Sequence, residues 1–145
     1  MIGLVQRVSQ ANVSVDNEIV GEINQGMLVL LGVEKNDTEA EIEKLTTKLC
    51  NYRMFSDEDG KMNLNIRQIS GEMLVVSQFT LVADTQKGNR PGFSKGASPE
   101  HGKNMYALFV ASLKNKGIEV ATGEFGADMK VALVNDGPVT FQFQV

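Results

Sequence analysis

Residues 72–82, EMLVVSQFTLV, place the strongest constraint on the fold, because they form a nearly continuous run of β-branched, aromatic and other apolar residues. Such a run predicts a strand in the middle of a sheet, with both of its faces covered. It is shorter than the ~20 apolar residues that a membrane-spanning helix needs, and no other run in the chain approaches that length. We therefore expect a buried sheet and no membrane segment.

Further strands and two helices are predicted around this segment. Alternating and short apolar runs mark the strands, with turn signals at Asp16-Asn17 and Gly137-Pro138. The predicted strands cover residues 2–15, 18–23, 27–31, 72–82, 118–122, 129–135 and 139–144, and the first of them is expected to be bent or bulged. One helix follows capping candidates at 36–38, and the other runs from Ser98-Pro99 to Gly117.

These elements define the fold class. A chain of 145 residues has the size of one ordinary domain. Strands dominate over the two predicted helices. We therefore predict a single α+β domain over residues 1–145, with a largely antiparallel or barrel-like β-sheet and about two helices.

Cysteine and histidine, which carry much of enzyme chemistry, occur once each, as Cys50 and His101. One cysteine cannot form an internal disulfide, and a single histidine excludes a two-histidine metal site. We expect Cys50 to fill the core and His101 to face solvent without a catalytic role. An enzyme with this composition is expected to work without a histidine base, and the lone cysteine and the lack of a secretion signal favour the cytoplasm.

Charge is distributed unevenly along the chain. The net charge is −4, so the chain as a whole lacks the positive electrostatic potential that attracts nucleic acid. The Gly- and Pro-bearing stretch 84–103 nevertheless carries four basic residues against two acidic ones, and Lys87, Arg90 and Lys95 lie in its loop. A solvated loop is the simple interpretation, and a local contact for a polyanion is the other.

Two polar stretches interrupt the predicted strands. The first, Ser77-Gln78-Phe79-Thr80, breaks the apolar run 72–82. Two explanations are open: hydrogen bonding of these side chains across the sheet, or a polar pocket that they line. The second, residues 135–140 (NDGPVT), contains a Gly-Pro pair that fits an ordinary turn or a cis peptide bond.

The two stretches together resemble the signature motifs of the D-aminoacyl-tRNA deacylase family, SQFTL at 77–81 and NDGPVT at 135–140. Further similar segments occur in the same order along the chain, namely Val5-Gln6-Arg7-Val8, Arg53-Met54-Phe55, Gly60-Lys61-Met62-Asn63 and Arg90-Pro91. The resemblance therefore covers essentially the whole chain.

The resemblance implies a homodimeric, cytoplasmic hydrolase without a metal or other cofactor. Such an enzyme would cleave the ester that joins a D-amino acid, or mischarged glycine, to the 3′-terminal adenosine of tRNA. The family's Gly-cis-Pro motif maps to Gly137-Pro138; it would reach into the partner subunit's site and exclude L-amino acids sterically. Arg7 would brace this motif, and its alternative interpretation is an exposed strand arginine.

Residue chemistry narrows the expected mechanism. The resemblance places Ser77, Gln78, Phe79 and Thr80 in the pocket, where backbone N–H groups of Phe79 and Thr80 are candidates for stabilising an oxyanion. Thr80 is the one plausible side-chain nucleophile, but no base is available to activate it. We therefore favour attack by water, assisted by the substrate's 2′-hydroxyl. Contact with tRNA is expected at the acceptor end, through Lys87, Arg90 and Lys95.

Two other functions fit the same residues. A non-catalytic RNA- or nucleotide-binding β-domain would use Phe79 as a stacking platform. A small thioesterase-like hydrolase would act on metabolites without needing RNA. Release of a D-amino acid from tRNA distinguishes both from a deacylase.

Overall fold

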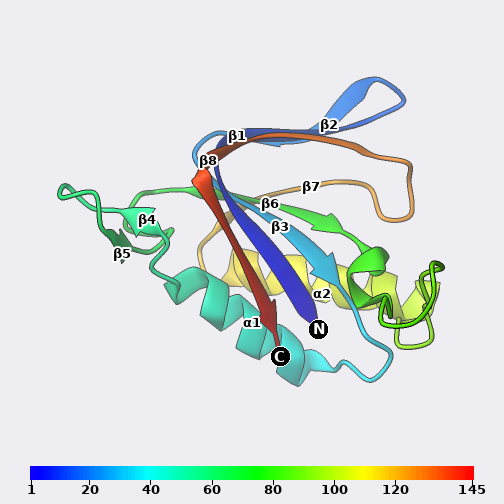
Figure 1. Cartoon of the computed structure of the whole chain (residues 1–145). Helices are drawn as coiled ribbons and strands as arrows, with labels where there is room; N and C mark the ends of the chain where they lie inside the picture. The colour runs from blue at the N-terminus through cyan, green and yellow to red at the C-terminus, as the bar shows by residue number, and fades with distance from the viewer.

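Eight strands and two α-helices make up the computed structural model, which describes residues 1–145 (Figure 1). The strands are β1 (Ile2–Val15), β2 (Glu18–Ile23), β3 (Gly26–Gly32), β4 (Phe55–Ser56), β5 (Met62–Leu64), β6 (Glu72–Ser77), β7 (Glu119–Thr122) and β8 (Lys130–Gln144). The helices are α1 (Glu39–Asn51) and α2 (Pro99–Asn115), and a short 3₁₀ helix, η1 (Phe79–Val82), follows β6. Neither α-helix is long and apolar enough to cross a membrane.

Six of the strands form one strongly curved sheet around β1. This strand pairs antiparallel with β2, β3 and β8, whereas β3–β6 and β6–β7 are parallel pairs. The sheet nearly closes on itself, because β2 lies so close to β7 that a Cβ at Gly21 would collide with the carbonyl oxygen of Thr122. The predicted α+β fold with a largely antiparallel, barrel-like sheet and two helices is confirmed.

The hairpin that links β1 and β2 has the turn that its sequence predicts. Asp16 and Asn17 both adopt positive φ, 50° and 65°, as a two-residue type I′ turn requires. The register of the pair shifts between Val13 and Ser14. The predicted bulge in the first strand is therefore confirmed, and it lets β1 bend from one part of the sheet to the next.

Both helices cover one face of the sheet (Figure 1). Leu45 of α1 and Phe109 of α2 are fully buried against Val29 and Val75, which belong to the central parallel strands. Each side chain of this kind contributes about 1.5–3 kcal/mol by leaving water. The opposite face of the same strands buries a second cluster that includes Leu28, so β3 and β6 are covered on both sides, as their apolar sequences predict.

Local sequence signals fix the helix ends. Thr38 caps α1 in a reciprocal box with Glu41, and Ser98 caps α2 with Pro99 at its first position. Cys50 is 1% exposed in the helix-facing core, and burial raises the pKa of its thiol. Its predicted role as core filler is confirmed.

The strand predicted over 72–82 is wrong in its second half. β6 ends at Ser77, and η1 replaces strand from Phe79 onward. The neighbouring strand β3 ends at Gly32, so the chain beyond Ser77 has no strand to continue pairing with. Gly32 also leaves room for η1, because a Cβ there would lie only 2.9 Å from the Cβ of Leu81.

The last two predicted strands are one long strand, β8, rather than two strands separated by a turn. Gln6 of β1 pairs with Thr140 and Val8 pairs with Asn135, so the residues between them bulge out of the ladder without ending it. The side chain of Asn135 bridges this bulge, because its Oδ1 accepts a hydrogen bond from the backbone N–H of Val139 at 2.8 Å.

Candidate active site

A pocket of about 450 Å³ opens where the carboxyl ends of β3 and β6 meet η1 and the start of α2. Pockets of this size bind small molecules or parts of larger ones. Its walls are largely apolar and come from four separate parts of the chain. The lining residues are Leu31, Val33, Ser77, Gln78, Phe79, Thr80, Ala97, Ser98, Pro99, Gly102, Phe125, Gly126, Ala127 and Met129.

The four predicted site residues Ser77, Gln78, Phe79 and Thr80 all line this pocket. The backbone N–H of Gln78 donates to the carbonyl of Leu31 at 2.8 Å, and the chain then turns into η1. Phe79 and Thr80 are the first residues of that helical turn, so their N–H groups have no partner within it. A continued strand would point these side chains alternately to opposite faces of the sheet, whereas the 3₁₀ turn brings all four to one pocket.

The Thr80 hydroxyl is not activated as a nucleophile. Its hydrogen bond comes from the Gln78 side-chain amide, Nε2 to Oγ1 at 3.2 Å. An amide nitrogen donates a proton and does not remove one. The pair Gln78–Thr80 can therefore orient a water or a substrate group, but it does not supply a general base.

The opposite wall of the pocket is built on a rigid aromatic support. Phe125 lines the pocket, and its ring centroid lies 5.9 Å from that of Tyr106 in α2. The Tyr106 hydroxyl donates to the carbonyl of Val75 at 2.7 Å, and burial raises the pKa of Tyr106 to about 12. The phenol therefore stays neutral and anchors α2 to β6, instead of taking part in proton transfer.

His101 lies near the pocket but does not line it. Its ring is half-buried, and Nε2 lies 3.0 Å from the carbonyl oxygen of Asp37. The expectation that this histidine faces solvent is therefore wrong, because helix packing brings the first turn of α2 against the segment before α1. Its lack of a catalytic role stays a prediction.

The second predicted region surrounds Gly137-Pro138, whose peptide bond is cis, as the family resemblance implies. Arg7 donates from Nε to the carbonyl of Asp136 at 2.8 Å and from a terminal nitrogen to the carbonyl of Met54 at 3.0 Å. Arg7 is therefore not a free strand arginine. It holds the backbone on the amino side of Gly137 against the loop that follows α1.

The two regions lie far apart within one chain. Arg7 pairs with Met27 across the β1–β3 ladder, whereas the pocket begins at Leu31, four residues further along β3. Four residues of strand span about 13 Å. Neither Gly137 nor Pro138 lines the pocket.

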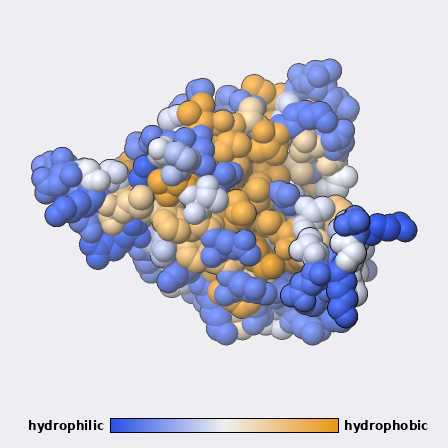
Figure 2. Space-filling view, viewed as in Figure 1, coloured by the Kyte–Doolittle hydropathy of each residue, from blue (hydrophilic) through white to orange (hydrophobic).

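Lys87, Arg90 and Lys95 are all exposed in the loop after η1, and none of them forms an ion pair. Figure 2 shows one face of the molecule, on which the projecting parts are hydrophilic and apolar surface gathers between them. Phe79 of η1 and Phe93 of this loop form an aromatic pair with ring centroids 5.2 Å apart. They are 67% and 44% exposed, so both rings are available for contact.

Residues 4–144 match the family model described as D-Tyr-tRNA(Tyr) deacylase. The chain belongs to this family. D-aminoacyl-tRNA deacylases of Alteromonas mediterranea and Pseudoalteromonas atlantica are 74% and 63% identical to it, each alignment covering 100% of both chains. The family resemblance of the sequence is thus confirmed.

Solved structures also resemble this deacylase-family chain. One, described as c-Myc DNA Unwinding Element Binding Protein, has a TM-score of 0.95 and 38% identity, covering 100% of this chain and 99% of its own. Another, described as a probable eukaryotic D-amino acid tRNA deacylase, has a TM-score of 0.87 at 16% identity, covering 99% of this chain and 98% of its own, and supports the fold.

Sequence reasoning missed part of the pocket of this deacylase-family member. Phe125 and Met129 line the pocket but carry no motif and lie far along the chain from residues 77–80. Only the tertiary fold brings them to η1. The sole sequence signal near them is the Ser98-Pro99 helix start, which predicts where α2 begins but not what lies beside it.

Proposed function

We propose that this chain hydrolyses the ester bond between a D-amino acid and the 3′-terminal adenosine of tRNA, and that it also accepts mischarged glycine. It is an enzyme of the D-aminoacyl-tRNA deacylase type, as the curated relatives at high identity are named. The observation that carries the proposal is the pocket at η1. All four residues of the 77–80 segment line it, and the backbone N–H groups of Phe79 and Thr80 have no partner within the helical turn.

Hydrolysis in this pocket needs few protein groups, because an ester of a ribose hydroxyl is already reactive. We propose that the N–H groups of Phe79 and Thr80 bind the developing oxyanion, and one such donor stabilises a transition state by about 2.7–4 kcal/mol. A water attacks the carbonyl carbon with the adjacent 2′-hydroxyl assisting. Ser77 and Gln78 complete this wall, and Thr80 orients groups without forming an acyl-enzyme.

Selection by handedness is assigned to Gly137-Pro138. D- and L-amino acids carry the same groups, so excluding the L side chain with a rigid wall is simpler than attracting the D form more strongly. Glycine passes this wall because it has no side chain. The hydrogen bond from Arg7 to the Asp136 carbonyl supports the proposal, because it fixes the backbone that leads into the wall.

A homodimer is part of the same proposal, with Gly137-Pro138 of each subunit completing the other subunit's pocket. Two observations support it. Neither residue lines the pocket of its own chain, and both are exposed on β8, which pairs with β1 alone. Unpaired strand edges and exposed apolar side chains such as Val134, which is 48% exposed, favour contact with another chain. Aminoacyl-tRNA as substrate places the enzyme in the cytoplasm.

Turnover tests the assignment against its alternatives. Purified protein should release a D-amino acid from tRNA. Binding of tRNA without release would support the non-catalytic RNA-binding domain, with Phe79 and Phe93 as stacking groups. Equal hydrolysis of simple thioesters that lack RNA would support a metabolite hydrolase.

Thr80→Ala should slow deacylation only moderately and leave clear turnover. Removing one orienting hydroxyl costs about 0.5–1.5 kcal/mol, which corresponds to a loss of roughly 2- to 12-fold in kcat. Thr80→Ser keeps the hydroxyl and serves as the matched control. Complete loss of turnover in Thr80→Ala, with folding and tRNA binding intact, would instead identify Thr80 as the nucleophile.

Charge reversal in the loop after η1 should weaken tRNA binding. Lys87→Glu, Arg90→Glu and Lys95→Glu together should raise the Kd by at least about tenfold at low salt and reduce the slope of log K against log salt by about 2. Lys44→Glu on the exposed face of α1 changes charge away from the pocket and should leave both quantities unchanged. An unaltered Kd in the triple variant would show that this loop does not contact tRNA.

A further inference from the structure

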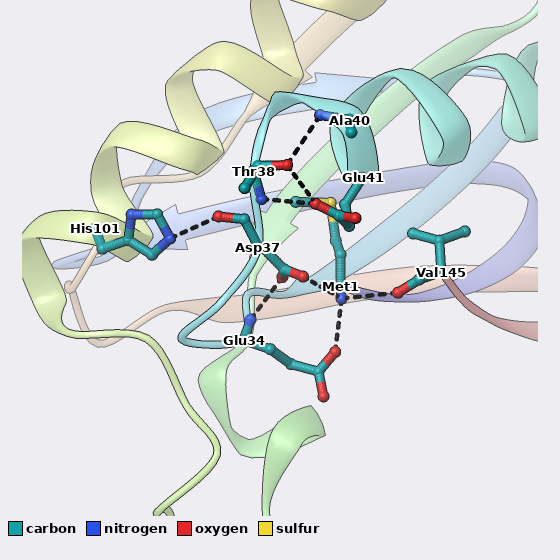
Figure 3. A network of polar contacts seen from close by, with 8 residues as sticks. All are labelled: Met1, Glu34, Asp37, Thr38, Ala40, Glu41, His101 and Val145. Atoms are coloured by element: carbon teal, nitrogen blue, oxygen red, sulfur yellow. Dashed lines mark hydrogen bonds and ion pairs between the residues drawn. The ribbon is translucent and has the colours of Figure 1, made fainter.

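The ammonium group of Met1 occupies a buried polar site (Figure 3). Met1 is fully buried, and its nitrogen lies 2.6 Å from a carboxylate oxygen of Glu34 and 2.7 Å from Oδ1 of Asp37. The carbonyl oxygen of Val145 accepts a third, longer bond at 3.3 Å. An ammonium group has three N–H donors, so this site matches each of them with an acceptor.

Asp37 connects this ammonium group to two other parts of the fold. Its side chain is 6% exposed, and Oδ2 accepts from the backbone N–H of Glu34 at 2.7 Å. Its backbone carbonyl lies 3.0 Å from the ring nitrogen Nε2 of His101, in the first turn of α2. Asp37 therefore joins the start of the chain, the segment between β3 and α1, and the start of α2 (Figure 3).

The same segments form walls of the pocket. Val33, directly before Glu34, lines it, as does Gly102, directly after His101. The carbonyl of Val33 accepts from the N–H of Ala97 at 3.1 Å, which ties the loop before α2 to the same segment. A shift of Glu34 or Asp37 would thus move two walls of the pocket together.

We propose that the free, charged α-amino group of Met1 and the carboxylate of Asp37 act together as positioning groups for the substrate pocket. This inference rests on the proposed function. An acetyl or formyl group on the amine removes its charge and most of its donors, and leaves the Asp37 carboxylate buried without its cation, which is strongly unfavourable. Acylation of this amine therefore distorts the pocket, although the amine touches no substrate.

Three forms of the chain test the proposal: one with a free Met1 amine, one acetylated there, and one with a single glycine added before Met1. The glycine keeps a positive charge but moves it by about 3.8 Å, beyond hydrogen-bond distance of Asp37. Both altered forms should raise the KM for D-aminoacyl-tRNA by about tenfold or more, with kcat nearly unchanged. Amide hydrogen exchange at Ala97 and Gly102 should become faster in both.

Asp37→Asn supplies the coupling test. Acetylation should raise KM much less in this variant than in the wild-type chain, because the ion pair between Met1 and Asp37 is already absent and only the one with Glu34 remains. If the increases in KM caused by acetylation and by Asp37→Asn simply multiply, the proposal is overturned. Equal KM values and equal amide exchange in the free and acetylated forms would also overturn it. Loss of exchange protection throughout the acetylated chain would show a general stabilising role and overturn local positioning.

Failure of the proposed function is separable from failure of this inference. If no form of the chain releases a D-amino acid from tRNA, exchange at Ala97 and Gly102 decides alone. Faster exchange confined to the pocket walls after acetylation supports the positioning role, and unchanged exchange contradicts it.

Discussion

Phe79→Pro is expected to lower kcat for D-aminoacyl-tRNA by about 10²- to 10³-fold, because it deletes one of the two backbone N–H groups assigned to the oxyanion. The substitution suits the local backbone. Position 79 is the first residue of η1, where proline fits a helical turn, and Gln78 before it lies outside the α region that a following proline disfavours, with φ −143° and ψ 89°. The fold should therefore survive, and single-turnover kinetics measures the loss.

Phe79→Ala is the matched control for this experiment. It removes the same exposed ring but keeps the backbone N–H. Any effect of the ring, which lies beside Phe93, falls on both variants equally and belongs to binding. Equal kcat values for the proline and alanine variants would contradict the assignment of the Phe79 N–H to the oxyanion.

Replacing the terminal 2′-hydroxyl of the substrate by hydrogen is expected to slow deacylation by about 10²- to 10⁴-fold, the range for a proton-transferring group. The expectation follows from the pocket, where the Thr80 hydroxyl accepts a hydrogen bond from an amide, and from His101, which lies outside the pocket and contacts the Asp37 carbonyl. A tRNA ending in 2′-deoxyadenosine and carrying the D-amino acid on its 3′-oxygen supplies the comparison.

The binding of that deoxy substrate must be measured alongside its turnover. Its Kd should stay close to that of the ordinary substrate, because the acceptor end and the basic loop are unchanged. A deoxy substrate that reacts at the normal rate would show that a protein group activates the water, and the walls of the pocket would then have to supply it.

Local patterns predicted most of the fold. The hairpin turn at Asp16-Asn17, the Ser98-Pro99 helix start and the burial of Cys50 depend on a few neighbouring residues, and the structure confirms them. The end of β6 was missed because it depends on where β3 ends, a long-range property that the apolar run does not record. The single strand β8 was missed because the side chain of Asn135 bridges a bulge that resembles a turn.

The site was predictable only where its residues are contiguous. Residues 77–80 form one segment whose polar break is visible in the sequence. Phe125 and Met129 reach the same pocket from a distant loop and carry no polar signal. The role of Asp37 could not be foreseen either, because its partner is the chain's own amino group, which no side-chain pattern reveals.

The most direct test of the account is a comparison of one tRNA charged with the D- and with the L-form of the same amino acid. We predict rapid release of the D-amino acid and release of the L-amino acid no faster than in buffer alone, because the main chain at Gly137-Pro138 excludes the L side chain. Equal release of both enantiomers by the purified protein would contradict it.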